Sequence, residues 1–313
     1  MQFDTIIIGS GLAGLTASIY ASRYKMANVV IGKLPGGTIT LAHKVENFPG
    51  FTSITGMELA RNVIMQVKAL GAEILPDEVV KVKVVEASGK IPHFFSVATE
   101  KGGEFEAQTL IATTGTERRQ LGVPGEKEYL GKGVSYCTHC DAPFFKGKTV
   151  AIVGGSDAAV GGAIHLSGFG QRVYIIYRKS ELRAEPIWVE EALNNPKVEV
   201  IYNTNVLEIL GDGNKVTGVK LDNPYKELTQ LPLDGVFIEI GGVPASSFLL
   251  PLGVELDENG YVKVNEKMET NVSGVFAAGD FTAQSLVLQQ AITACAQGAI
   301  AASSAFKYLR GKK

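Results

Sequence analysis

The residues with the clearest chemical potential are two cysteines in the segment Cys137-Thr138-His139-Cys140-Asp141. Two thiols at this spacing can close a disulfide, and one thiol can lower the pKa of the other. Half of a structural zinc site has the same spacing, but such a site needs four ligands. The remaining thiol, Cys295, and His165 provide neither a second C-x-x-C nor a histidine pair. The pattern therefore favours redox chemistry, and we expect no metal site.

Two further residues, Asp141 and His139, allow more than one interpretation, whereas Cys295 allows one. Asp141 could pass a proton to a departing thiolate, or it could cap the next turn. His139 could support a thiolate electrostatically, or it could be an exposed loop residue without a role. Cys295 lies in an Ala-rich stretch and is expected to be a small buried hydrophobic residue.

A glycine-rich turn near the start of the chain has the context of a dinucleotide site. Gly9-Ser10-Gly11-Leu12-Ala13-Gly14 follows the apolar run 3–8 and precedes a helical segment, 15–23, and a second strand, 27–31. The first glycine permits a tight turn, the second admits a pyrophosphate, and the third allows helix and strand to pack closely. The acid that usually meets the ribose at the end of the second strand is missing, since Gly32 stands there.

A second turn, Gly154-Gly155-Ser156-Asp157-Ala158-Ala159, lies between an expected strand, 149–153, and an expected helix, 160–167. Ser156 replaces the glycine that admits the pyrophosphate, although its hydroxyl could donate to a phosphate. After the next strand, 173–177, come three cations and no acid: Arg178, Lys179 and Arg183. Such cations favour the 2′-phosphate of NADP, and a solvated basic helix start is the alternative.

Two such units in 313 residues predict two domains. Further strands are expected at 79–85, 94–99, 109–114 and 274–280, and an Ala-rich helix at 286–309. We expect an α/β fold with two Rossmann-like nucleotide-binding domains, the second inserted into the first. The first would comprise residues 1–116 and 247–313, and the second residues 117–246. Short connections at 115–124 and 241–247 are candidate hinges.

Composition excludes several classes of function. Hydrophobic residues make up 45 % and charged residues 20 % of the chain, which is typical of a soluble globular protein. The net charge is −2, and no basic tract indicates binding to nucleic acid or to an anionic membrane. We find neither a signal peptide nor an apolar stretch long enough for a membrane span. With three cysteines in all, a cytoplasmic location is expected.

Together, the motifs make the chain resemble the low-molecular-weight thioredoxin reductases along nearly its whole length. The resemblance rests on the order and spacing of six segments, which are Gly-Ser-Gly-Leu-Ala-Gly at 9–14, Pro-Gly-Gly at 35–37, Val-Glu-Asn-Phe-Pro-Gly at 45–50, Val-Pro-Gly-Glu at 123–126, Cys-Thr-His-Cys-Asp at 137–141 and Thr-Asn-Val-Ser-Gly-Val-Phe-Ala-Ala-Gly-Asp at 270–280.

The resemblance implies FAD in the split domain and NADPH in the inserted one. Gln289 replaces an Arg that is usual in the family, so a local positive charge is absent. The implied FAD contacts are Gly9, Ser10, Gly11, Ala13, Gly14, Gly36, Gly37, Asn47, Gly115, Gly279, Asp280, Gln289, Gln290 and Ala291. The NADPH contacts would be Gly154, Gly155, Ser156, Asp157, Ala158, Arg178, Lys179 and Arg183.

The resemblance also implies a relay. A hydride passes from NADPH to FAD, the electrons pass to the Cys137–Cys140 disulfide, and the dithiol reduces thioredoxin or a thioredoxin-like protein. Cys140 would be the sulfur on the flavin side, and Asp141 the proton donor. Family members are homodimers and rotate the inserted domain between two half-reactions.

Departures from the family concentrate in the inserted domain and leave the electron donor open. Ser156 replaces a glycine, and Gly161-Gly162 stands where the family has two acids. The donor is therefore either NADPH or a carrier such as ferredoxin. Two other classes remain: a FAD protein that senses redox state without turnover, and a ferredoxin–NADP reductase of similar fold. The cysteine pair disfavours the second of these.

Overall fold

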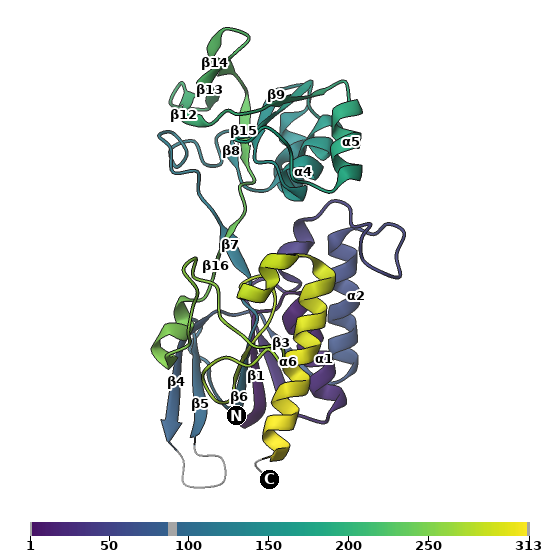
Figure 1. Ribbon diagram of the computed structural model, residues 1–313, viewed down its shortest axis with the longest axis vertical. Helices are drawn as coiled ribbons and strands as arrows, with labels where there is room; N and C mark the ends of the chain where they lie inside the picture. Colours follow the sequence, from purple (N-terminus) through teal and green to yellow (C-terminus); the bar gives the residue numbers. More distant parts are fainter. Residues whose placement is uncertain (1, 87–92, 312–313) are drawn as a thin grey trace. The chain divides into compact units, whose positions relative to one another are not determined.

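The computed structural model describes residues 2–86 and 93–311 (Figure 1). The chain forms two compact units, one of Met1–Glu117 with Val243–Lys313 and one of Arg118–Gly242. The two connecting segments, β7 (Thr116–Arg118) and β16 (Gly242–Pro244), pair as a two-stranded sheet. The expected α/β fold with one unit inserted into the other is confirmed. The expected boundaries lay at 116/117 and 246/247, and the nucleotide assigned to each unit stays a prediction.

The discontinuous unit is built on a seven-stranded sheet in the order β3-β2-β1-β6-β5-β4, with β17 also paired to β6. Helices α1 (Leu12–Arg23), α2 (Gly56–Ala69) and α6 (Ala291–Gly311) pack together beside it (Figure 1). Its strands are β1 (Gln2–Ile8), β2 (Asn28–Ile31), β3 (Glu73–Leu75), β4 (Val79–Glu86), β5 (His93–Thr99), β6 (Glu104–Ala112) and β17 (Val275–Ala277).

The central strands of this sheet are parallel and buried on both faces. Ile7 pairs with Val30 of β2 and with Ile111 of β6, and all three side chains are fully buried. Continuous runs of β-branched residues are typical of such strands, because both faces of the sheet are covered. Since parallel strands end at the same edge, the turns after β1 and β17 are brought together there.

The inserted unit has its own parallel sheet, in the order β11-β10-β9-β15-β8. A three-stranded antiparallel sheet, β12-β13-β14, completes the unit. The helices are α3 (Thr138–Asp141), α4 (Asp157–Ser167) and α5 (Pro186–Asn194), and the strands are β8 (Val134–Ser135), β9 (Thr149–Val153), β10 (Arg172–Ile176), β11 (Val198–Ile201), β12 (Val206–Gly211), β13 (Val216–Tyr225), β14 (Leu228–Pro232) and β15 (Gly235–Ile238).

The last helix begins later than the sequence predicted. A short 3₁₀ helix covers Ala283–Val287, Leu288 is extended, and α6 starts at Ala291 rather than at 286. Thr293, in the first turn of α6, holds the backbone before the helix, since its hydroxyl accepts from Gln290 N and donates to Leu288 O at 2.7 Å. The predicted helix is confirmed but its predicted start was wrong, because alanine-rich composition does not reveal the local side-chain hydrogen bonds of Thr293. The break leaves the side chains of Gln289 and Gln290 outside the helix.

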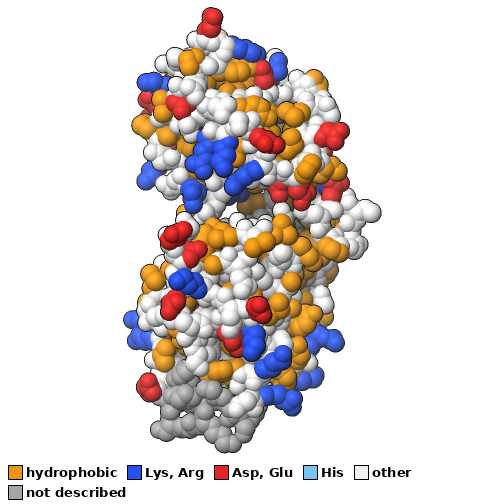
Figure 2. Space-filling view, viewed as in Figure 1, with side chains coloured by type: hydrophobic (Ala, Val, Ile, Leu, Met, Phe, Trp, Pro, Cys, Tyr) orange, Lys and Arg blue, Asp and Glu red, His pale blue; other side chains and the backbone are white. Residues whose placement is uncertain are grey.

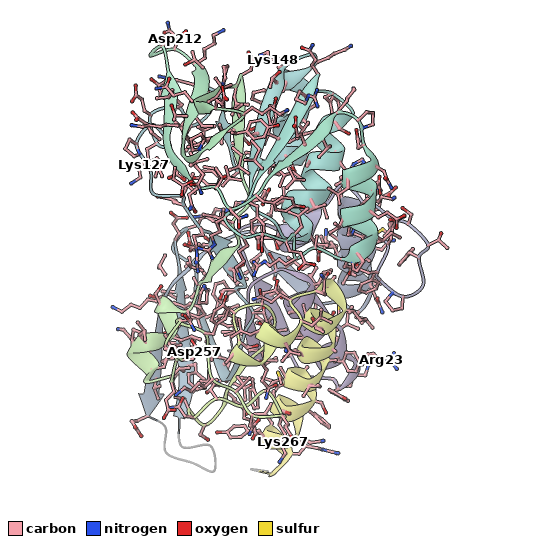
Figure 3. The ribbon with its side chains drawn as sticks, turned by 45° about the horizontal axis from the view of Figure 1, so that its top comes forward. Arg23, Lys127, Lys148, Asp212, Asp257 and Lys267 are labelled. Atoms are coloured by element: carbon pink, nitrogen blue, oxygen red, sulfur yellow. A yellow bond between two sulfur atoms is a disulfide. The ribbon has the colours of Figure 1, made fainter. Side chains whose placement is uncertain are left out.

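Charged side chains of both signs are scattered over the face shown in Figure 2. The carboxylates of Asp212 and Asp257 lie in tight turns (Figure 3) and accept hydrogen bonds from nearby backbone N–H groups. These bonds lower the pKa of Asp212. Among the helices of residues 2–86 and 93–311, none combines the length and apolar character of a membrane span.

Candidate active site

The first glycine turn links β1 to α1 and depends on two very close approaches. Gly9 has a φ of +112°, and a Cβ atom there would lie 2.2 Å from Thr113 O. At Gly14 a Cβ atom would lie 2.0 Å from Gly9 O. Such distances exclude any side chain, so both glycines are required by packing. A Cβ atom at Gly11, in contrast, would have its nearest neighbour 3.9 Å away, which leaves this position open to a ligand.

A second segment, residues 34–37, closes over this turn. Gly36 N donates to Ser10 O at 2.8 Å, and Ser10 Oγ donates to Leu34 O at 2.9 Å. A Cβ atom at Gly37 would lie 2.7 Å from the Cα atom of Gly11. The structure therefore brings Ser10, Gly11, Gly36 and Gly37 together. Helix α1 begins next to the open Gly11, and the first N–H groups of a helix suit an anionic group such as a pyrophosphate.

The missing ribose acid has a steric explanation. Gly32 follows β2, and a Cβ atom there would lie 2.5 Å from both the backbone nitrogen and the hydroxyl oxygen of Ser10. Any side chain at this position would therefore displace the glycine turn.

Gly279 and Asp280 follow β17 at the same edge of the sheet. A Cβ atom at Gly279 would lie 3.0 Å from the Cβ atom of Ala13, so the two turns are in contact. Asp280 Oδ1 is buried and has no hydrogen-bond partner within the described residues. Burial raises the pKa of this carboxyl, since the charged form loses its hydration. A buried acceptor without a donor is rare, and a ligand carrying hydroxyl groups would supply one.

The start of α6 completes this group of residues. Gln289 Nε2 donates to Asp280 O at 3.0 Å, and Asn47 Nδ2 donates to Gln290 Oε1 at 3.3 Å. Ala291 is the first residue of the helix. The expected contacts thus come together from four distant parts of the chain. Gly115, also expected there, lies at the start of the connecting segment, where its carbonyl accepts from Ala245 N at 3.1 Å.

Sequence reasoning missed three residues that hold this site. Thr113 Oγ1 donates to the backbone where β1 ends, 2.9 Å from Gly9 O. Gln297 Oε1 accepts from Gly279 N at 2.8 Å. A Cβ atom at Gly298 would lie 2.1 Å from Ala13 O, so this glycine lets α6 approach α1. Each stands in an ordinary strand or helix sequence, and no local signal distinguishes it.

The second glycine turn joins β9 to α4 in the inserted unit. Gly154 has a φ of +145°, and a Cβ atom there would lie 2.2 Å from Glu239 O. A Cβ atom at Gly155 would lie 2.6 Å from the ring of Tyr177, which covers it. Ser156 is extended and precedes the first residue of α4. This turn is therefore shaped like the first one, but its second residue is overlaid by an aromatic side chain.

The segment after β10 is hydrogen-bonded to this turn. Arg183 N donates to Gly155 O at 2.8 Å, and Glu185 N donates to Asp157 Oδ1 at 2.7 Å. The side chains of Arg178, Lys179 and Arg183 are exposed, and within residues 2–86 and 93–311 none of them has an ion-pair partner. Ala158 lies in the first turn of α4. All the expected residues of the second site thus lie around one turn.

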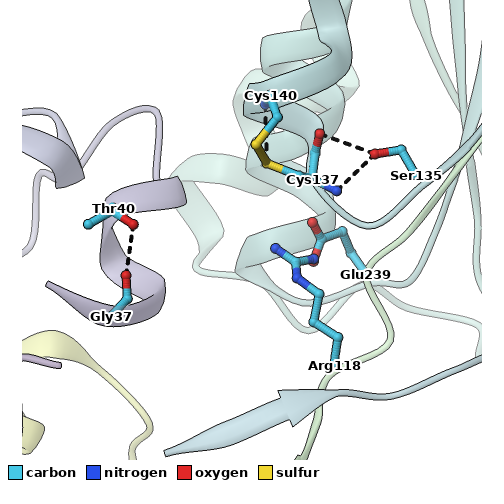
Figure 4. Close-up of a disulfide and its surroundings, with 7 residues drawn as sticks. All are labelled: Gly37, Thr40, Arg118, Ser135, Cys137, Cys140 and Glu239. Carbon is cyan, nitrogen blue, oxygen red and sulfur yellow. Dashed lines mark hydrogen bonds and ion pairs between the residues drawn. A yellow bond between two sulfur atoms is a disulfide. The ribbon is translucent and has the colours of Figure 1, made fainter. Parts of the chain in front are cut away.

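Cys137 and Cys140 form a disulfide, with an S–S distance of 2.08 Å (Figure 4). Cys137 precedes the single turn of α3, and Cys140 N lies 3.1 Å from its Sγ. Ser135 fixes the preceding backbone: its hydroxyl accepts from Cys137 N at 2.9 Å and donates to Cys137 O at 3.3 Å. Asp141 is the next residue and is partly exposed. The sequence prediction of a disulfide is confirmed.

The disulfide turn packs on α4 at Gly162, whereas a Cβ atom at Gly161 would have no neighbour within 4 Å. A Cβ atom at Gly162 would lie 3.0 Å from Thr138 Cγ2 and 2.9 Å from Ile152 Cδ1, so a side chain there would push α3 away. The rings of His139 and His165 lie beside this contact, with centroids 5.4 Å apart. His139 is therefore in contact with α4 rather than an isolated loop residue.

Three other titratable groups lie in the two units, Arg118 and Glu239 in the inserted unit and Cys295 in the discontinuous one. Arg118 and Glu239 form an ion pair of 2.8 Å (Figure 4), and burial raises the pKa of Glu239 while Arg118 opposes the shift. Cys295 is partly buried next to α1, and burial raises the pKa of its thiol. Because a thiol is a poor nucleophile compared with a thiolate, Cys295 is unsuited to disulfide exchange.

Comparisons with known proteins agree with this arrangement. The family model "Pyridine nucleotide-disulphide oxidoreductase" matches residues 3–298. A thioredoxin reductase of Listeria innocua is 41 % identical over 313 residues, covering 99 % of this chain and 95 % of the relative.

Solved structures are similar over the whole chain. The thioredoxin reductase of Lactococcus lactis has a TM-score of 0.91 at 35 % identity, covering 99 % of both chains. The ferredoxin-flavin thioredoxin reductase of Clostridium acetobutylicum has a TM-score of 0.52 at 33 % identity, also covering 99 % of both chains. On its sequence, its fold and its disulfide, the chain belongs to the pyridine nucleotide-disulphide oxidoreductase family and, within it, to the thioredoxin reductases.

Proposed function

We propose that the chain reduces a thioredoxin-like protein disulfide with electrons from NADPH, and that Cys137 and Cys140 carry those electrons. The observation that supports this most directly is the disulfide itself, held at the start of a helical turn with Asp141 as the next residue. FAD, when bound, supplies the two-electron relay between nicotinamide and disulfide. The open position at Gly11 and the orphaned Asp280 carboxylate fit that group.

On the side of this chain, the exchange with the partner protein uses Cys137, Cys140 and Asp141. Two electrons and two protons convert the disulfide into a dithiol. The Cys137 thiolate attacks one sulfur of the partner disulfide, forms a mixed disulfide and releases a partner thiolate. The Cys140 thiolate then attacks Cys137 Sγ, which closes the ring and releases the second partner thiolate. Asp141 holds the proton that a departing thiolate takes up.

NADPH as donor is supported by the cations at the second glycine turn. Three exposed cations without acidic partners suit an added phosphate group. Replacing Arg178, Lys179 and Arg183 together by Ala is expected to raise the KM for NADPH by about tenfold or more while leaving the KM for NADH nearly unchanged. Steady-state kinetics with both nucleotides would measure this. Equal losses with both would contradict a 2′-phosphate contact.

Lys148 provides the matched control for this triple variant. It is exposed and precedes β9, so it lies at the opposite edge of the parallel sheet from the glycine turn (Figure 3). Lys148→Ala should leave the KM for NADPH unchanged.

A carrier protein is the second candidate donor. Ser156 in the glycine turn and the Tyr177 ring over Gly155 favour it, since both reduce access to the backbone. So does the similarity to a ferredoxin-flavin thioredoxin reductase. Anaerobic titration of the flavoprotein with NADPH, NADH and reduced ferredoxin separates the two. Rapid bleaching of the flavin by micromolar NADPH supports the first donor, and bleaching by ferredoxin alone supports the second.

Asp280 provides a test of the FAD site in the flavin-free protein. Burial raises the pKa of Asp280 in the folded protein above its value near 3.8 in the unfolded chain. The stability associated with the neutral carboxyl is therefore fully present below pH 3.8 and is lost as pH rises through the pKa of the folded protein. At pH 7 the buried charge costs about 1–3 kcal/mol. Asp280→Asn should therefore stabilise the flavin-free protein at pH 7, by less at pH 4.5, while weakening FAD binding.

Thermal unfolding of both flavin-free proteins across this pH range measures the effect. A stability difference that does not change with pH would contradict the assignment.

We also propose a homodimer in the cytoplasm, on the resemblance to the family, and light scattering on the purified protein tests the dimer.

A further inference from the structure

A buried carboxylate that the proposed mechanism does not use lies close in sequence to the disulfide. Glu126 is 2 % exposed. Its Oε1 accepts from Leu121 N at 2.7 Å and its Oε2 from Gly122 N at 2.6 Å, while the Tyr136 hydroxyl donates to Oε1. Within the described residues it has no cationic partner. Three donors thus replace the hydration of a buried charge.

This carboxylate joins two segments of the inserted unit. Leu121 and Gly122 follow the connecting strand β7, whereas Tyr136 directly precedes Cys137. The turn between them is itself rigid. A Cβ atom at Gly125 would lie 2.0 Å from Ile209 O, and Ile209 N donates to Pro124 O at 2.9 Å. Tyr136 is therefore anchored to a fixed point of the scaffold.

We propose that Glu126 is a positioning residue for the redox pair, which acts through Tyr136 to hold the backbone of Cys137 within reach of Cys140. This rests on the proposed role of the two cysteines. Ser135 fixes the backbone of Cys137 from one side, and the Glu126–Tyr136 bond fixes the residue between them. The pKa of Tyr136 is raised by burial and by Glu126, so its hydroxyl remains a donor at neutral pH.

The physical consequence concerns the equilibrium between disulfide and dithiol. A fixed backbone keeps the two thiols at high effective concentration and so favours the closed ring. Loosening the backbone gives freedom mainly to the dithiol, which is not cross-linked. The closed form then becomes less stable, and the midpoint potential of the pair rises.

The test compares Tyr136→Phe with a matched control in the same unit. Tyr225 also donates to a carboxylate, Glu199, which Lys226 and Arg172 pair with as well. Each substitution removes one phenol–carboxylate bond and keeps the ring. The FAD-loaded protein is equilibrated with dithiothreitol buffers, in which two electrons and two protons pass between reagent and disulfide. Alkylation and mass spectrometry then count the free thiols.

We expect Tyr136→Phe to shift the equilibrium about tenfold toward the dithiol, an upward change of about 30 mV for a two-electron couple. Tyr225→Phe should lower the midpoint temperature of unfolding about as much as Tyr136→Phe does, but it should leave the midpoint potential of the cysteine pair unchanged. Glu126→Gln should act like Tyr136→Phe, and the double variant should shift the potential by less than the sum. If Glu126→Gln fails to fold, Tyr136→Phe alone decides.

Equal potentials for Tyr136→Phe, Tyr225→Phe and the parent would overturn this inference while leaving the redox role of the cysteines intact. If Cys137 and Cys140 of the parent do not titrate as a two-electron pair, the proposed function fails and the inference fails with it.

Discussion

Cys140→Ser is expected to abolish protein-disulfide reduction while leaving the flavin bound. A serine hydroxyl cannot form or accept the disulfide, so Cys137 is left as a single thiol with no sulfur to close the ring. The loss of turnover should be on the order of 10⁴-fold, as for other nucleophile deletions. The residues grouped around the first glycine turn belong to the other unit and are unchanged. Flavin content should therefore equal that of the parent.

The measurement is steady-state reduction of thioredoxin together with the ratio of flavin to protein absorbance. The same variant should also trap a mixed disulfide through Cys137, visible as a covalent adduct on a non-reducing gel. Cys295→Ser is the matched control, because this thiol is partly buried and lies outside the disulfide. It should retain activity. A redox-sensing protein without turnover would show no activity even in the parent, and that result would contradict the proposed function.

Two alanine substitutions in the first glycine turn are expected to have different effects: Gly14→Ala should impair folding, whereas Gly11→Ala should weaken FAD binding and leave folding nearly unchanged. A Cβ atom at Gly14 would lie 2.0 Å from Gly9 O, so the substitution forces the turn apart, at a cost of about 3–5 kcal/mol. Gly11 has an ordinary φ of −74° and no atom within 3.9 Å of a new Cβ. Folding should therefore tolerate alanine there to within about 0.5 kcal/mol.

The open position at Gly11 is where the backbone must admit a pyrophosphate. Gly11→Ala should therefore weaken FAD binding on the order of 100-fold, about 2.7 kcal/mol. Thermal unfolding of the flavin-free protein gives the folding term, and calorimetric titration with FAD gives the binding term. Normal FAD affinity in folded Gly11→Ala would show that the cofactor does not approach this residue.

Much of this architecture could be predicted because its signals are local. The turn at residues 9–14 joins a continuous apolar strand to a helix, and its glycines occupy positions where backbone geometry admits nothing else. The disulfide follows from two thiols three residues apart, a spacing that one turn of backbone can close. The presence of two nucleotide-binding-like units followed from repetition of the same β-turn-α-β pattern. None of these inferences needs a residue elsewhere in the chain.

The start of α6 shows where local reasoning stops. Alanine-rich composition indicated a helix from 286, whereas the helix begins only at Ala291, which leaves two glutamine side chains outside it. Gln290 then meets Asn47, 243 residues away, and Gln289 meets the backbone of Asp280. Such pairings depend on where folding places distant backbones, not on the identity of neighbours in sequence.

By itself, then, the sequence determined the two glycine turns, the cysteine pair and the α/β class, since backbone sterics and thiol chemistry act over a few residues. Only the tertiary structure explains why an acidic residue cannot stand at position 32 and why glycine is needed at positions 298 and 162. In each case a segment far along the chain occupies the space a side chain would need. It also decided the environment of Glu126, because the donors around a buried carboxylate come together only when the chain is folded.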